Sequence, residues 1–270
     1  MTPADALLTA GAGLLAGAVN AIAGGGTLIA FPALLTTGMP ALTANITSSV
    51  GLLTGYAGGA LGYRRELADQ LDRLRALGPP AMLGGIVGAV VLLATPSDSF
   101  RALVPYLVLV SCLLLAAQTR LAALVARRRA ADGGSGNGGS GNGRSGNGES
   151  GNGVTWPTRI GIFVAGVYGS YFGAGLGVLL LGVLGILLVD DLQRTNALKT
   201  LLAFGVNALG VAVFLVTAKV AWGYAGILVV ASLLGGLLGA RIARRLSPAL
   251  LRTAVITLGV TVAIVLIVRN

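Results

Sequence analysis

The chain is poor in charge and has no histidine. Only 10% of its 270 residues are charged and 55% are hydrophobic, with a mean hydropathy of +0.86, whereas a soluble domain averages roughly 25% charged residues. The absence of histidine removes the usual proton shuttle and a common metal ligand. The single cysteine, Cys112, excludes a disulfide within the chain. This composition is that of a protein that lies in a lipid bilayer.

Sequence motifs of enzymes are also missing. The chain has no CxxC pair, no GxSxG motif, no Walker motif and no carboxylate pair inside an apolar segment, since Asp190 and Asp191 stand at a segment's end. A membrane enzyme normally needs an acid, a base or a metal ligand within the membrane. We therefore expect no enzyme, no metal and no cofactor. The net charge of +10 does not indicate nucleic acid, because the arginines lie between apolar segments, where the positive-inside bias places them.

Long stretches without charge predict an all-α, polytopic membrane protein. No charged residue occurs between Asp5 and Arg64, or between Arg159 and Asp190. Such stretches must be helical in lipid, because unpaired backbone amides cost several kcal/mol there. The expected apolar helices are Ala4–Ala23, Thr27–Thr37, Leu42–Tyr63, Leu77–Ala94, Ala102–Ala126, Ile160–Phe172, Gly177–Val189, Leu198–Val216, Gly223–Ala240 and Ala249–Val268.

Two of these segments are too short to cross a membrane as straight helices. A spanning helix needs about 20 apolar residues, and Thr27–Thr37 and Gly177–Val189 fall well short of that length. Each follows a glycine break. We expect both to be half-helices of a discontinuous or re-entrant element, and the sequence does not choose between these two forms.

The same features occur twice along the chain. Gly24–Gly26 corresponds to Gly173–Gly175, and Leu83–Ala89 (LGGIVGA) corresponds to Leu234–Ala240 (LGGLLGA). A duplicated membrane segment with paired glycine breaks is typical of secondary transporters built from inverted repeats. The expected fold is therefore two inverted repeats with glycine-broken helices.

A low-complexity tract separates the two repeats. We expect a first transmembrane repeat over residues 1–126, a linker over 127–158 and a second repeat over 159–270, with a Gly/Ser/Asn-rich tract at 133–153 that is flexible because it buries no apolar surface. Arginines at 64, 65, 73 and 75, at 127–129, and at 241, 244 and 245 mark the cytoplasmic side. Counting crossings from them gives the repeats opposite orientations in the inner membrane and makes the linker cytoplasmic.

The glycine breaks are the first candidate site. Gly24, Gly25 and Gly26 in the first repeat, and Gly173 and Gly175 in the second, free backbone amides within an apolar setting. If a helix restarts after each break, its first amides and the positive end of its dipole form an anion site. The alternative is that the glycines only let helices approach closely.

Two polar helix faces form the second candidate. Asn45, Ser48 and Ser49 are spaced to share one face, and Asn196, Lys199 and Thr200 repeat that spacing. Amide, hydroxyl and ammonium donors suit a small oxyanion. Alternatively, Lys199 extends to the cytoplasmic surface beside Arg194 or pairs with Asp190 or Asp191. Tyr171 and Phe172, directly before the second break, are either a gate or packing residues.

The sequence resembles a known transporter family at these motifs. The segments AGAVNAIAGGGTLIAFPALLTTGMP (residues 16–40) and ALTANITSSVGLLTGYAGGALGYRREL (residues 41–67) are similar to the TauE/SafE, or sulfite exporter, family of bacterial permeases. The resemblance covers nearly the whole chain except residues 133–153. It implies transport of small sulfur-containing or carboxylate anions, with a site between the repeats at the residues named above. The second break reads Gly-Ala-Gly, so the two sites need not be equivalent.

These observations favour an exporter of sulfite or an organosulfonate that works by alternating access. A channel-like anion pore and a carrier for a small carboxylate are the alternatives. No histidine, and no carboxylate inside an apolar segment, is available to carry a coupled proton. Passive flux, or a substrate that carries its own proton as bisulfite does, fits better. The expected partners are the anion and the bilayer, and the sequence leaves a homodimer open.

Overall fold

The chain folds as a bundle of helices. The computed structural model describes residues 1–22, 25–62, 70–133, 154–188, 192–242 and 248–269. The helices in this part of the chain are α1 (Pro3–Ile22), α2 (Thr27–Thr36), α3 (Ala41–Gly62), α5 (Leu71–Ala94), α6 (Ser97–Gly133), α7 (Trp156–Tyr171), α8 (Leu176–Leu187), α9 (Leu192–Thr217), α10 (Trp222–Ile242) and α11 (Pro248–Arg269). The predicted all-α architecture is confirmed, and each predicted apolar segment overlaps one of these helices.

Several helices, α5, α6 and α9 among them, extend beyond their apolar stretch. α5 begins at Leu71 rather than Leu77, so Arg73 and Arg75 lie on its first turns. α6 continues through Arg127–Arg129 to Gly133. Hydropathy marks the part of a helix that lipid covers, whereas backbone hydrogen bonding continues into the polar ends. Pro79 and Pro80 lie inside α5, which membrane helices tolerate.

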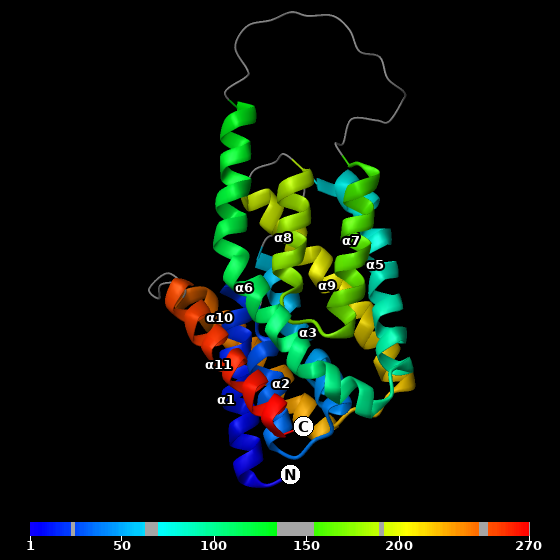
Figure 1. Cartoon of the computed structure of the whole chain (residues 1–270), viewed down its shortest axis with the longest axis vertical. Coiled ribbons are helices and arrows are strands. Elements are labelled where there is room, and N and C mark those ends of the chain that lie inside the picture. Colours follow the sequence, from blue (N-terminus) through cyan, green and yellow to red (C-terminus); the bar gives the residue numbers. More distant parts are fainter. Residues whose placement is uncertain (23–24, 63–69, 134–153, 189–191, 243–247, 270) are drawn as a thin grey trace, which may run out of the picture.

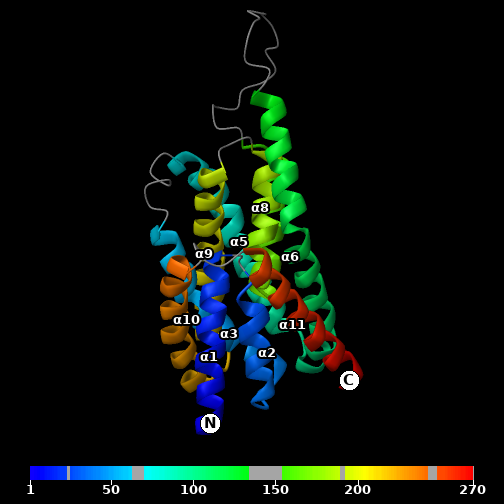
Figure 2. The same cartoon turned by 90° about the vertical axis from the view of Figure 1, so that its left-hand side faces the viewer.

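The two short helices turn back near the middle of the molecule. Figure 1 shows α1 rising from the end that holds both termini and α2 returning toward that end. It shows α7 descending from the opposite end, where α6 terminates, and α8 returning there. Figure 2 shows the same course for α1 and α2 from the side. Each glycine break is thus the tip of a helical hairpin, and the two hairpins enter from opposite ends.

The first hairpin is packed tightly against α10. A Cβ atom added to Gly17 on α1 would overlap the backbone of Ser232 on α10, and one added to Gly235 on α10 would overlap the carbonyl of Leu14 on α1. Small residues let membrane helices approach to backbone contact, which is where their association gains most dispersion energy. Gly235 belongs to the duplicated LGG motif, so this glycine serves helix packing.

The second hairpin is packed in the same way against α5. A Cβ added to Gly84 on α5 would overlap the carbonyl of Phe163 on α7, and one added to Gly166 on α7 would come within 2.7 Å of the carbonyl of Ala81 on α5. Gly84 is the first-repeat counterpart of Gly235. α3 additionally packs on α9 and α10, and α6 packs on α11.

The outer surface of the bundle is apolar. Three helical stretches are long and apolar enough to span a bilayer among the residues described, namely Leu71–Ala94, Ser97–Gln118 and Arg194–Thr217. Large aliphatic side chains are exposed along them and along α1, α7 and α10, including Val90 and Leu113. A soluble protein does not leave such surface in water, so these faces meet lipid.

Candidate functional site

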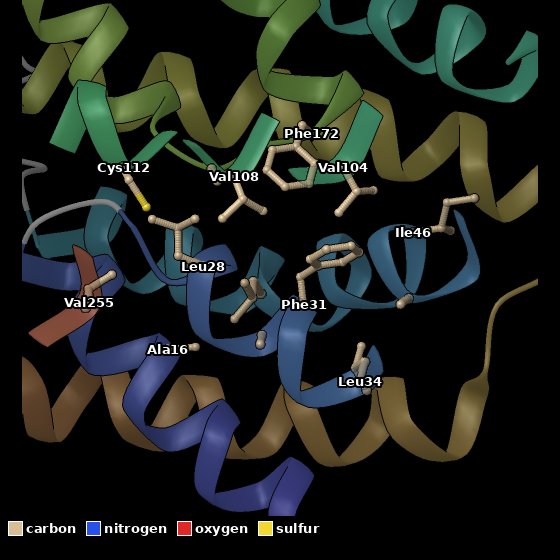
Figure 3. Packing of buried hydrophobic residues seen from close by; sticks show 14 of the residues in the cluster. Ala16, Leu28, Phe31, Leu34, Ile46, Val104, Val108, Cys112, Phe172 and Val255 are labelled. Carbon is tan, nitrogen blue, oxygen red and sulfur yellow. The ribbon is translucent and has the colours of Figure 1, made fainter. Parts of the chain in front are cut away.

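The two glycine breaks meet inside the molecule. A Cβ on Gly173, in the second break, would lie 3.6 Å from Oγ1 of Thr27, the first residue of α2. Phe31 on α2 and Phe172 beside the second break pack edge to face, with ring centroids 5.5 Å apart and an interplanar angle of 79°. Figure 3 shows these two rings facing each other, with Val104 and Val108 of α6 beside them. The sequence predicted two breaks, and the structure brings them together.

The second break needs glycine for its backbone conformation. Gly173 and Gly175 have φ values of 81° and 84°, which side chains disfavour by roughly 1–2 kcal/mol. The amides of Val178 and Leu179 donate to the carbonyl of Gly175, at 3.0 and 3.1 Å. The amides of Ala174, Gly175 and Gly177 have no backbone partner in the described part of the chain. They stand at the positive end of the α8 dipole, where an anion is stabilised.

The first break uses its glycines differently. Gly26 precedes α2 with φ −58°, an ordinary helical value, and a Cβ there would overlap the carbonyl of Ala16 on α1. Gly25 is buried against Leu115 of α6. For Gly26, close helix approach therefore accounts for the residue. Gly24 lies outside the described residues.

Asn45 links the first repeat to the second break. Its side chain is fully buried, and Nδ2 donates to the carbonyl of Tyr171 at 2.9 Å. Its Oδ1 has no hydrogen-bond partner within the described structure. The hydroxyls of Ser48 and Ser49 both donate to the backbone carbonyl of Asn45, at 2.9 Å. Of this predicted face, Asn45 is the member that reaches the break.

The second polar face is held together by its own hydrogen bonds. Lys199 Nζ donates to Oδ1 of Asn196 at 3.2 Å, and Thr200 Oγ1 donates to the backbone carbonyl of Asn196 at 2.7 Å. The bond from Thr200 repeats the one from Ser49 to Asn45 four residues earlier in its own helix. All three side chains are half-buried. The alternative partners of Lys199, Asp190 and Asp191, lie outside the described residues.

Ser111 on α6 is a site residue that our sequence reasoning missed. Its Oγ lies 3.1 Å from the carbonyl of Ala174, 2.8 Å from that of Leu107 and 2.7 Å from the hydroxyl of Tyr168. In a trans peptide the N–H of Gly175 points opposite to the carbonyl of Ala174. Ser111 therefore turns that N–H away from α6. The available signal was a lone hydroxyl in the middle of an apolar run.

The site is closed and apolar around its donors. Asn45, Ser48, Gly25, Gly26, Gly173 and Gly175 are all buried. Phe31, Leu28, Val108 and Cys112 pack around the two breaks. In such low-dielectric surroundings a backbone amide attracts an anion more strongly than it does in water. A separate groove with a volume of about 550 Å³ lies between α5 and α9.

The sequence is similar to known membrane transporters. The sequence model of the sulfite exporter TauE/SafE family matches residues 9–266. A probable membrane transporter protein of Haemophilus influenzae is 25% identical over 244 residues, covering 90% of this chain and 87% of the relative. The probable membrane transporter protein ORF9 of Sinorhizobium sp. is 25% identical over 255 residues, covering 94% and 88%.

The match runs through both hairpins and both polar faces. A family of membrane transporters is consistent with the apolar outer surface described above. The chain is therefore a multi-pass membrane protein. It also confirms the prediction of a transporter rather than an enzyme. The chain belongs to the sulfite exporter TauE/SafE family of membrane transporters.

Proposed function

We propose that the protein exports a small sulfur-containing anion, such as sulfite or an organosulfonate, across the bacterial inner membrane. The observation that carries the proposal is the meeting of the two glycine breaks in the interior. At this point the carboxamide of Asn45 bonds the backbone of Tyr171, just before the second break, and the first amides of α8 follow just after it. The family's description as a sulfite exporter supports the sulfur chemistry.

The proposed site binds its anion through neutral donors. Backbone amides at Ala174, Gly175 and Gly177 supply hydrogen bonds, and Ser111 orients the Gly175 amide. Asn45 holds the second break through its bond to the carbonyl of Tyr171, and Gly25, Gly26 and Gly173 shape the two breaks. Gly24, Ser48, Ser49, Asn196 and Thr200 belong to the proposed site on the sequence pattern alone. Lys199 offsets charge near the linker side. A site without a fixed cation at its centre holds a monoanion loosely enough to release it, as transport requires.

We further propose that the two halves, residues 1–126 and 159–270, are inverted repeats joined by a cytoplasmic linker over 127–158. The helix pairings support this relation. α1 packs on α10 as α5 packs on α7, and α3 packs on α10 as α5 packs on α9. Each pairing is the other with the halves exchanged. The hairpins also enter from opposite ends of the molecule.

Transport then proceeds by alternating access, and the structure described above corresponds to a state in which both glycine breaks are closed off from either side. Passive flux needs no coupled proton, and the membrane potential, negative inside, favours anion export. A channel-like pore would conduct without alternation, and a carrier for a small carboxylate would use the same amides. A counterflow assay distinguishes the proposed carrier from a channel-like pore. Only a carrier exchanges labelled anion outside for unlabelled anion inside faster than it carries out net transport.

The test is flux of radiolabelled sulfite into proteoliposomes, with sulfate and acetate as competitors. We expect saturable sulfite flux that falls in Asn45→Ala and in Ser111→Ala. The matched control is Asn207→Ala, which removes a buried carboxamide that donates only to the carbonyl of Ala203 in its own helix. Saturable acetate flux without sulfite flux would move the substrate to a carboxylate, and loss of flux in the control alone would place the site elsewhere.

A further inference from the structure

The carboxamide of Asn45 is fixed in one orientation. Its partner on one side is the carbonyl of Tyr171, which can only accept a hydrogen bond, so the atom facing it must be the amide nitrogen. The oxygen, Oδ1, is consequently the atom left without a hydrogen-bond partner among the described residues. Because the side chain is fully buried, this is a hydrogen-bond acceptor held inside the protein without a donor.

This acceptor lies beside the second break. Oδ1 and Nδ2 of Asn45 are bonded to the same carbon. Because Nδ2 bonds the carbonyl of Tyr171, Oδ1 also lies close to that residue, which stands two positions before Gly173. Gly175 and Gly177, four and six residues after Tyr171, present amides that have no backbone partner in the described part of the chain. The site therefore offers donors and one obligate acceptor together. A buried polar atom without a partner is costly, and a ligand that supplies an O–H would remove that cost.

We propose that the site takes its anion in a protonated form, with the anion's O–H donating to Oδ1 of Asn45 while its oxygens accept from the amides of the second break. This inference rests on the proposed function and specifies its substrate as a hydroxylated monoanion, such as bisulfite in its O–H form. A fully deprotonated anion would place oxygen against oxygen and is rejected. The proton then crosses with the substrate, and no ionisable group of the protein has to carry it.

The decisive probe is methanesulfinate, in which a methyl group replaces the hydroxyl of bisulfite at nearly the same size and the same charge. We would measure labelled sulfite flux in proteoliposomes of the full chain at pH 6, with unlabelled bisulfite, hydrogen selenite and methanesulfinate as competitors. We expect hydrogen selenite, which keeps the O–H, to compete comparably with bisulfite. Methanesulfinate should compete about ten- to a hundred-fold more weakly, because it leaves Oδ1 unpaired.

A variant locates the effect. Asn45→Leu keeps the branched shape of the side chain but cannot accept a hydrogen bond. In the reduced flux that remains, the preference for bisulfite over methanesulfinate should therefore collapse to within about two-fold, whereas the control Asn207→Leu should keep the wild-type preference. The wild-type ratio stands as a test even where Asn45→Leu does not fold. Equal competition by methanesulfinate in the wild type, with sulfite flux intact, would overturn the inference and leave the proposed function standing. Absence of flux for every sulfur anion would instead overturn the proposed function.

Discussion

The glycine contact between α1 and α10 predicts a measurable stability difference on one helix. Gly235 and Gly226 both lie within α10, but a Cβ on Gly235 would overlap the carbonyl of Leu14, whereas one on Gly226 meets no atom within 4 Å. Both Gly→Ala changes gain about 1 kcal/mol of helix propensity. Their difference therefore isolates overpacking, for which we expect about 1–3 kcal/mol, because a backbone carbonyl cannot rotate away.

The assay is reversible unfolding in mixed micelles, followed by the fluorescence of the two tryptophans. Gly235→Ala should have the lower free energy of unfolding by that amount, and Gly84→Ala on α5 should lose about as much through the carbonyl of Phe163. Equal free energies for Gly235→Ala and Gly226→Ala would refute the reasoning. A loss at Gly235 without one at Gly84 would refute the equivalence of the two contacts.

Further changes test the second break and its surroundings. Gly173→Ala and Gly38→Ala share the same unfavourable φ, so each should lose about 1–2 kcal/mol of stability in the same micelle assay. Only Gly173→Ala, whose methyl would lie 3.6 Å from Oγ1 of Thr27 where the two breaks meet, should also reduce sulfite flux; equal flux in the two variants would contradict a role for that turn. Ser111→Ala frees the carbonyl of Ala174 and should raise the KM for sulfite several-fold at little cost in stability; an unchanged KM would dismiss the positioning role. Phe31→Ala should cost about 3–5 kcal/mol in the micelle assay, against little for the exposed Tyr106→Ala, and near-equal losses would contradict the packing in Figure 3.

The helices could be predicted from the sequence because their positions depend on local features, namely apolar stretches and the glycines that interrupt them. α2 and α8 were expected as half-length helices after glycine breaks, and they begin at Thr27 and Leu176. What was not predictable is how each glycine is used. Gly26 and Gly175 occupy corresponding positions, yet one is helical and touches α1 while the other is left-handed. Such differences are set by tertiary neighbours, which a single sequence does not display.

The candidate site shows the same division. Asn45 stood out because an amide in an apolar helix requires a partner, but its partner is a backbone carbonyl 126 positions away, at Tyr171. Backbone acceptors leave no trace in a sequence pattern. Ser111 was overlooked for a related reason, since isolated serines in membrane helices commonly bond their own helix, as Ser111 also does with Leu107.

The backbone contacts of α1 with α10, and of α5 with α7, bear on how the protein is made. Synthesis delivers α1 to the membrane long before α10 exists, so the glycine faces of the early helices must wait in lipid for a partner. The N-terminal half is therefore not a finished folding unit when the ribosome reaches the Gly/Ser/Asn-rich tract, and assembly completes only after α10 has been inserted. Any rigid unit built on these contacts is likewise a composite, because it contains helices from both halves of the chain.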